Sequence, residues 1–228
     1  MIGIIGAMAK EVESLIATMK QEKTETISGI TFYVGTLCGQ DVVIAKCGVG
    51  KVCAAVCAQT MIFHFGADTL INSGVAGALD TSLSIGDIVI ATSLVQHDVD
   101  TSPLGDPVGY ISELKKIEMP TSSALVDLAE KVAQKQNVRY HKGVIASGDC
   151  FVVAPETNQT IRQRFGAKAC EMEGGAMAQV CQMNDVPFVV LRAISDTADD
   201  RASMDYPTFV AIAAEKMAKL VKEVLKEM

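Results

Sequence analysis

Hydrophobic residues along the chain fall into two alternating patterns. Short runs that are apolar at almost every position predict strands buried on both faces, and these runs cover residues 2–7, 30–37, 42–47, 68–73, 85–93, 143–148 and 187–194. Between them, apolar residues spaced three and four apart predict amphipathic helices, over residues 12–19, 52–65, 122–136, a segment from 155, a segment ending at 183, and 209–225. This alternation indicates an α/β fold with a mostly parallel or mixed sheet. Ligands in such folds bind at the carboxyl ends of the strands.

Residues 94–120 interrupt this pattern. Prolines at 103 and 107 and glycines at 105 and 109 break any regular period. An irregular segment of this length inside a compact domain usually has a function. Elsewhere there is no linker, repeat or low-complexity tract, and 228 residues suit one domain. We therefore expect a single domain over residues 1–228.

Composition narrows the class of partner. Asp and Glu total 27 against 20 Lys and Arg, which gives a net charge of -7, whereas nucleic acids and anionic membranes bind basic surfaces. No run approaches the ~18 apolar residues of a membrane span, and the apolar start meets Lys10 and Glu11 at once, unlike a signal peptide. The seven cysteines include no CxxC pair, which favours free thiols in a reducing compartment. We expect a cytoplasmic protein without nucleic-acid or membrane partners.

Two glycine-rich turns invite nucleotide-binding interpretations that their spacing does not support. The glycines at 3 and 6 do not fit GxGxxG, and a Walker A motif ending at Lys51 would need glycine at position 45 and a hydroxyl residue at position 52. The chain has Ala45 and Val52 there, so residues 48–51 predict a tight turn whose amides could face a ligand. His97 and Asp98 have no partners at metal-ligand spacing, so we expect them to be solvated or hydrogen-bonded and predict no metal site.

Carboxylates follow several predicted strands. Glu11 comes one helical turn after the first strand, Glu171 and Glu173 flank Met172, and Asp196 follows the most apolar run in the chain. From the residues alone, three interpretations stay open: acid–base chemistry on a neutral small molecule, ordinary helix capping, and binding without chemistry.

Five motifs then coincide with a known family. They are GIIGAMAKE (3–11), NSGVAG (72–77), SGDCF (147–151), EME (171–173) and RAISD (192–196), in this order. The chain resembles the bacterial 5'-methylthioadenosine/S-adenosylhomocysteine nucleosidases of the purine nucleoside phosphorylase superfamily, over nearly its whole length. The resemblance implies a three-layer α/β/α sandwich around a mixed sheet. It also implies a homodimer in which the loop at 94–120 contributes to the neighbouring site, and hydrolysis of the adenine–ribose bond without metal or organic cofactor.

The resemblance assigns two catalytic carboxylates. Asp196 matches the acid that protonates the purine, with Ser195 as its orienting partner, and Glu11 matches the base that activates water. An ordinary Asp has a pKa of about 3.9, so proton donation at neutral pH requires a raised pKa, which a desolvated position supplies. This division of labour resembles that of inverting glycosidases.

The resemblance also assigns substrate contacts. Glu173 matches the acceptor of the ribose hydroxyl groups, and its charge would favour a cationic transition state. Met172 would pack on the sugar, and Arg192 would be an electrostatic partner of the site carboxylates or a structural ion pair. The remaining residues would surround the base or close the site: Phe151 by stacking, Val152 through its backbone, Ala76 and Gly77 by being small, and Tyr206 as an aromatic cover.

Three departures from the family affect these expectations. Val75 stands where many relatives carry serine, and two glycines at 174–175 predict a loosened helix start. The segment 98–120 also differs, so substrate breadth stays open. The nearest rival is a nucleoside phosphorylase, which would need arginines around phosphate. This chain has no arginine before Arg139 and has Glu11 at the corresponding place, which favours water. A non-catalytic nucleoside-binding protein is the rival from another class.

Overall fold

The computed structural model describes residues 1–197 and 206–228, with only the backbone described at 197 and 206–208. Its strands are β1 (Ile2–Gly6), β2 (Lys20–Ile27), β3 (Ile30–Leu37), β4 (Gln40–Lys46), β5 (Thr69–Ala78), β6 (Ile88–Gln96), β7 (Met119–Pro120), β8 (Tyr140–Ser147), β9 (Ala169–Glu171) and β10 (Phe188–Thr197). Its α-helices are α1 (Ala9–Ile16), α2 (Lys51–Phe63), α3 (Ser123–Lys135), α4 (Pro155–Phe165), α5 (Gly174–Met183) and α6 (Tyr206–Glu227). The α/β fold with a mixed sheet is confirmed.

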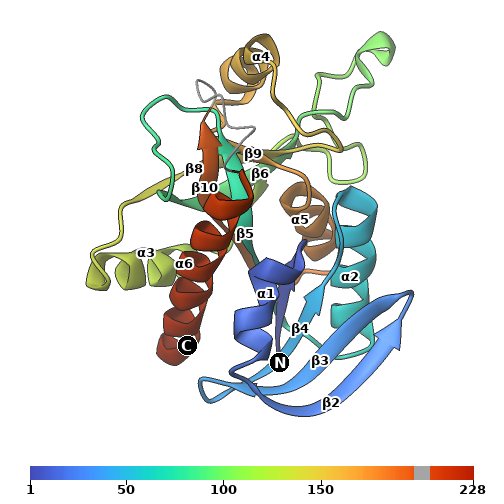
Figure 1. The fold of residues 1–228 in the computed structure, drawn as a ribbon. Coiled ribbons are helices and arrows are strands. Elements are labelled where there is room, and N and C mark those ends of the chain that lie inside the picture. Colours follow the sequence, from blue (N-terminus) through green and yellow to red (C-terminus); the bar gives the residue numbers. More distant parts are fainter. Residues whose placement is uncertain (198–205) are drawn as a thin grey trace.

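The sheet is partly closed on itself. Its order is β10-β6-β8-β9-β5-β1-β4-β3-β2, and β10 also pairs with β5. Because β5 pairs with β1, β9 and β10, five strands form a ring from which β1, β4, β3 and β2 extend as a wing (Figure 1). Strands β1, β4, β5 and β10 run parallel, while β2–β3, β3–β4, β10–β6 and β5–β9 are antiparallel. Strand β5 is therefore the common element of the ring and the wing.

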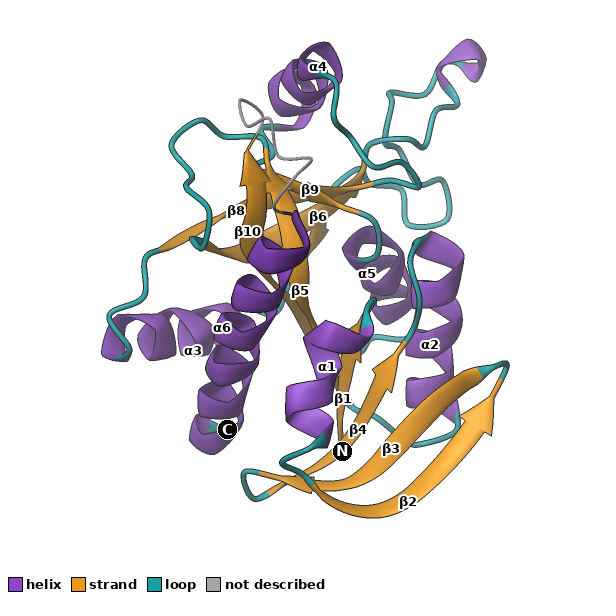
Figure 2. Cartoon of the chain, viewed as in Figure 1, coloured by secondary structure: helices purple, strands orange, loops and turns teal. Residues whose placement is uncertain are grey.

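Helices cover both faces of this sheet. One core cluster joins α1, α3 and α6 to the sheet, and a second joins α2 and α5 to the other face (Figure 2). Adjacent residues of β1 show the division, since Ile4 belongs to the first cluster and Ile5 to the second, both fully buried. Successive side chains of a strand point to opposite faces, so a strand between two helical layers must be apolar throughout. The expected layered arrangement is confirmed.

Strand β2 was absent from the sequence-based expectation. Its residues KQEKTETI are mostly exposed and polar on both sides, because β2 is an edge strand that pairs only with β3 among the described residues. Charged residues on an edge strand discourage pairing with other chains.

The irregular segment at 94–120 is shorter than expected. Strand β6 continues to Gln96, and β7 pairs with β6 at Met119 and Pro120. Between them lies a single 3₁₀ turn over Ser102–Leu104.

Among the described residues, no helix is long and apolar enough to cross a membrane.

Candidate active site

A fully buried cation lies at the centre of the candidate site. Arg192, on β10, has no exposed surface. Its Nη2 donates to Glu171 and, at 2.6 Å, to Oδ1 of Asn72. Asn72, on β5, is itself fixed because its Nδ2 donates to the Ile5 carbonyl at 2.9 Å. The same Nη2 lies 3.6 Å from Oε2 of Glu173. Arg192 therefore links β10 to β5, β9 and the start of α5.

Glu11 approaches the same cation from α1. Its carboxylate is only 2% exposed, and it accepts backbone hydrogen bonds from Val75 at 3.0 Å and from Met8 at 2.8 Å. Met8 precedes the first turn of α1, so Glu11 caps its own helix. Burial raises the pKa of Glu11, against the opposing effects of Arg192 and of these backbone amides. A carboxylate with a raised pKa is a better base than an ordinary one.

Glu173 is the third carboxylate of this cluster. It is 5% exposed and stands at the N-cap position of α5. Its Oε1 accepts the backbone N–H of Gly50 at 2.9 Å. Burial, followed by the negative charge of Glu171, raises its pKa to about 7, although Arg192 and the Gly50 amide act in the opposite direction. The carboxyl group therefore changes its charge within the physiological range.

Gly74, on β5, makes room for two of these groups. A Cβ atom at this position would lie 2.1 Å from Nη1 of Arg192 and 2.5 Å from Oε1 of Glu11. Both distances are far below a van der Waals contact, so only glycine fits between the cation and the carboxylate. Sequence reasoning expected the glycines at 74–77 to follow the strand, but they lie inside β5.

Asp196 lies on β10 beside Gly77 of β5, directly after a β-bulge in β10. Ile194 pairs with Ala76 and Asp196 pairs with Gly77, so Ser195 is the extra residue of β10. Bulges re-aim side chains near the ends of strands. Here Ser195 Oγ donates to Asp196 Oδ1 at 2.7 Å, and a Cβ on Gly77 would lie 2.9 Å from Asp196 Oδ2. The expected contact between Ser195 and Asp196 is confirmed.

The other residues predicted to contact the substrate differ in how far they are exposed. Met172 is half-buried in the turn between Glu171 and Glu173, and Ala76 is buried. Phe151 is 55% exposed, and Val152 packs against the small apolar cluster near α4. Tyr206 is the first residue of α6, and its side chain lies outside the described part of the structure.

Three polar residues of the cluster received no role from the sequence. Glu171, the last residue of β9, pairs with Arg192 across 21 positions of the chain. Asn72 reaches Arg192 across 120 positions, and Ser147 reaches Glu171 across 24. The EME motif contains Glu171, but neither its spacing nor its charge distinguishes it from Glu173.

The glycines at 174–175 do not loosen the start of α5, which corrects the sequence expectation. The Gly175 amide donates to Ser147 Oγ at 2.6 Å, and a Cβ there would lie 2.8 Å from Ser147 Cβ. The helix start is packed too closely for a side chain at this position.

The turn at 48–51 presents its amides to carboxylates of the protein itself. The Gly50 amide binds Glu173, and the Lys51 amide donates to Asp149 at 2.7 Å. Lys51 Nζ also pairs with Asp98 at 2.6 Å, so Asp98 is hydrogen-bonded as expected. Within residues 1–197 and 206–228, no group of three or more His, Cys, Asp or Glu could hold a metal ion.

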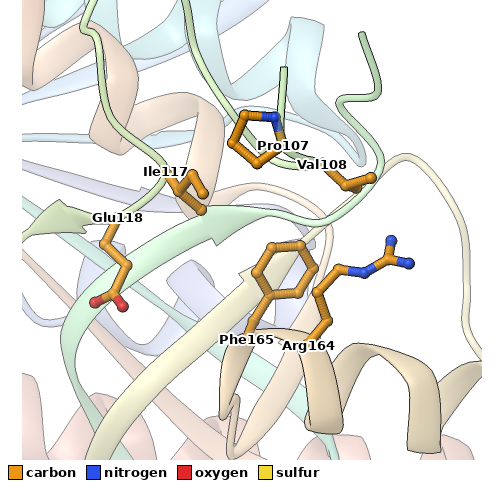
Figure 3. Close-up of a pocket in the computed structure, with 6 residues that line it drawn as sticks. All are labelled: Pro107, Val108, Ile117, Glu118, Arg164 and Phe165. Atoms are coloured by element: carbon orange, nitrogen blue, oxygen red, sulfur yellow. The ribbon is translucent and has the colours of Figure 1, made fainter. Parts of the chain in front are cut away.

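A separate cavity of about 410 Å³ lies between the loop that follows β6 and the end of α4. In Figure 3 the Phe165 ring faces the apolar side chains, while the guanidinium of Arg164 and the carboxylate of Glu118 point away to either side. The lining residues are Pro107, Val108, Ile117, Glu118, Arg164 and Phe165. None of them belongs to the Arg192 cluster.

Comparisons with known proteins identify the family of the chain. Residues 1–226 match the phosphorylase superfamily. A 5'-methylthioadenosine/S-adenosylhomocysteine nucleosidase of Shewanella oneidensis is 41% identical, with 100% of this chain and 97% of the relative covered.

Solved structures show the same similarity. The 5'-methylthioadenosine/S-adenosylhomocysteine nucleosidase of Helicobacter pylori, in complex with a substituted pyrrolidin-3-ol, superposes with a TM-score of 0.94 at 39% identity, covering 100% of this chain and 98% of the other. A futalosine hydrolase of Helicobacter pylori gives a TM-score of 0.95 at 38% identity, covering 100% and 97%. The chain therefore belongs to the phosphorylase superfamily and, within it, to the family of 5'-methylthioadenosine/S-adenosylhomocysteine nucleosidases, which are enzymes.

Proposed function

We propose that this protein hydrolyses the N-glycosidic bond of 5'-methylthioadenosine and S-adenosylhomocysteine. The products are adenine and either methylthioribose or S-ribosylhomocysteine. The names of the relatives support the substrate class. The observation that carries the chemistry is the placement of two carboxylates along β5: Glu11 beside Gly74 and Val75, and Asp196 beside Gly77. In this proposal the sugar and a water lie between the acid and the base, as in inverting glycosidases.

Asp196 serves as the acid in this proposal. As the bond between C1' and the purine nitrogen breaks, its electron pair moves onto the purine, and Asp196 gives its proton to N7. Ser195 donates to Oδ1 of Asp196 and thereby orients its carboxyl group. This step requires a protonated Asp196 at neutral pH, as the sequence-based prediction states.

Glu11 serves as the base. A water held beside Glu11 gives up a proton to the carboxylate while its oxygen bonds to C1'. Arg192 has two guanidinium nitrogens, Nε and Nη1, without a hydrogen-bond partner among the described residues. Since Nη1 and Glu11 Oε1 both border Gly74, the guanidinium is placed to donate to that water. The proton released by water stays on Glu11, and the proton given by Asp196 leaves with adenine.

Glu173 accepts the ribose hydroxyl groups, and its negative charge stabilises the cationic sugar in the transition state. We place Met172 against the sugar and Phe151 on the adenine ring, with the Val152 backbone at the purine edge. Ala76 and Gly77 leave room for the nucleoside, and Tyr206 covers it.

Water is favoured over phosphate by the same contacts. The amides of Met8 and Val75 could otherwise cradle an anion, but Glu11 occupies both. Arg192 is already surrounded by the carboxylates of Glu11, Glu171 and Glu173. A phosphate group would have to displace a buried carboxylate and then meet two more.

The deciding experiment measures adenine release from 5'-methylthioadenosine with and without phosphate. The expected rate is the same in both, and the sugar product carries no phosphate. A rate proportional to phosphate, with a ribose 1-phosphate product, would establish the phosphorylase. Binding without adenine release would establish a non-catalytic nucleoside-binding protein. Asp196→Asn should remove most turnover but keep binding, and near-full activity of this variant would contradict the acid assignment.

A second substrate class is supported by the futalosine hydrolase of similar structure. Comparing 5'-methylthioadenosine, S-adenosylhomocysteine, 5'-deoxyadenosine and aminodeoxyfutalosine by kcat/KM orders these substrates.

We further propose that residues 1–228 form one domain of a cytoplasmic homodimer serving methionine salvage, with the loop at 94–120 reaching the neighbouring site. Sedimentation at micromolar concentration tests the dimer.

A further inference from the structure

Glu171 is the most completely paired carboxylate of the site. Its side chain is 2% exposed. Oε1 accepts from Ser147 Oγ, while Oε2 accepts from Arg192 Nη2, from the Glu173 amide at 3.1 Å and from the Gly174 amide at 2.7 Å. A carboxylate offers about four acceptor positions. Oε2 already accepts three hydrogen bonds, and the whole side chain is buried, so Glu171 is closed to a substrate and any effect on the reaction must pass through its neighbours.

The first of these neighbours is the guanidinium of Arg192. Its Nη2 makes hydrogen bonds to Glu171 and Asn72, but lies 3.6 Å from Glu173 Oε2. The cation thus makes a charge-assisted hydrogen bond with Glu171, and its effect on Glu173 is that of a nearby charge alone. Glu173 Oε2 is thereby left available for a ribose hydroxyl.

The second neighbour is the start of α5. Glu171 binds the amides of Glu173 and Gly174, and Ser147 Oγ accepts the amide of Gly175. These are among the amides that a helix leaves without internal partners. Because Glu173 is the N-cap residue of α5, these bonds also fix the backbone from which its carboxylate extends.

Charged and titratable groups face Glu173 from every element around it. They are Glu171 from β9, Arg192 from β10, Glu11 from α1 and the Cys47 thiol after β4, together with the Gly50 amide before α2. The charge of Glu171 is, after burial, the strongest influence raising the pKa of Glu173. Without that charge, Arg192 would be free to pair with Glu173, which also lowers its pKa.

We propose that Glu171 is a positioning residue, which holds Arg192 away from a direct hydrogen bond with Glu173 and fixes the start of α5, so that the Glu173 carboxylate is presented to the ribose hydroxyl groups. The role in turnover rests on the proposed function. The hydrogen bonds that fix Glu173 and Arg192 do not rest on the proposed function, because they exist in the protein without substrate.

The test compares Glu171→Gln with Glu171→Asp and with the control Glu130→Gln. Glu130, on α3, accepts from Tyr140 and Lys142 away from the site. The first readout is the titration of Glu173 by carbon NMR in the free protein, assigned by the loss of its signal in Glu173→Gln. We expect Glu173 to titrate near its pKa of about 7 in wild type and in Glu130→Gln, and at least one pH unit lower in Glu171→Gln.

The second readout is the pH profile of kcat/KM for adenine release. We expect its plateau to fall at least tenfold in Glu171→Gln and its acid limb to move to lower pH. Glu171→Asp keeps the charge but shortens the reach, so its plateau should fall while Glu173 still titrates near the wild-type value. A merely structural Glu171 would lower rate and stability at all pH values without moving the titration.

The titration of Glu173 tests the role of Glu171, whereas adenine release tests the proposed function. An unchanged Glu173 titration in a folded Glu171→Gln protein would overturn it, as would a wild-type Glu173 that titrates near 4.5. If Glu171→Gln does not fold, Glu171→Asp decides, because an unchanged plateau of kcat/KM in that variant would overturn the proposal. An absence of adenine release in wild type, with the expected titrations, would overturn the proposed function and leave the positioning by Glu171 standing.

Discussion

A single methyl group on β5 tests how Asp196 is placed. In Gly77→Ala the added Cβ would lie 2.9 Å from Oδ2, 3.6 Å from Cγ and 3.7 Å from Oδ1 of Asp196. Ordinary contact begins at 3.4 Å, so the carboxylate must retreat by roughly 0.5 Å and turn against its hydrogen bond with Ser195. Since misplacements of about 1 Å cost roughly 100-fold in rate, we expect kcat to fall about 10- to 100-fold, or about 1.4 to 2.7 kcal/mol.

The assay is adenine release under single-turnover conditions, together with thermal unfolding. Alanine fits the extended backbone of β5, so the melting temperature should change little. The control is Gly143→Ala on β8, where the three atoms nearest to the new Cβ all belong to the flexible Lys168 side chain. If Gly77→Ala kept kcat within about twofold of wild type and raised KM alone, Gly77 would contact substrate rather than position Asp196, and the reasoning would be refuted.

Three further predictions concern stability. Gly74→Ala should cost about 3 kcal/mol or more in urea unfolding, because its Cβ would lie 2.1 Å from a guanidinium nitrogen that has nowhere to move; wild-type stability would show that β5 can shift. Leu220→Ala, on the buried face of α6, should cost about 2–5 kcal/mol, and a loss below 1 kcal/mol would contradict its placement. Between pH 4.5 and about 7 the native state keeps the Glu173 proton that the unfolded chain has lost. Stability should therefore fall as pH rises through this window, by up to about 3 kcal/mol, and a Glu173→Gln protein with the same slope would contradict this origin.

The elements that the sequence predicts well are those whose apolar residues pack into the core. Strand β3 has the predicted bounds 30–37, and the bounds of α2, 51–63, differ from the predicted 52–65 by one residue at the start and two at the end. Both pack into the core, so their apolar residues define them. Strand β2 was missed because an exposed edge strand carries no apolar period. Its pairing with β3 is a property of the backbone, which composition does not report.

The candidate site divides in a similar way. Motifs identify Glu11, Glu173 and Asp196 because their residue types carry chemistry. The contacts that place them join distant parts of the chain: Gly50 and Glu173 are 123 positions apart, and Val75 and Glu11 are 64 apart. No local pattern encodes such pairs, so sequence reasoning assigned no role to Glu171, Asn72 or Ser147. The raised pKa of Asp196 stays a prediction.

In the proposed reaction, the same contacts favour water over phosphate. Three carboxylates, Glu11, Glu171 and Glu173, face the single buried cation Arg192. Burial raises the pKa values of Glu11 and Glu173, and the charge of Arg192 opposes this rise at both groups. An anionic co-substrate would increase the excess negative charge, whereas a neutral water adds none. A water beside Glu11 can also surrender a proton to it, and that transfer reduces the same excess charge. The electrostatics of the cluster and the choice of nucleophile thus have one cause.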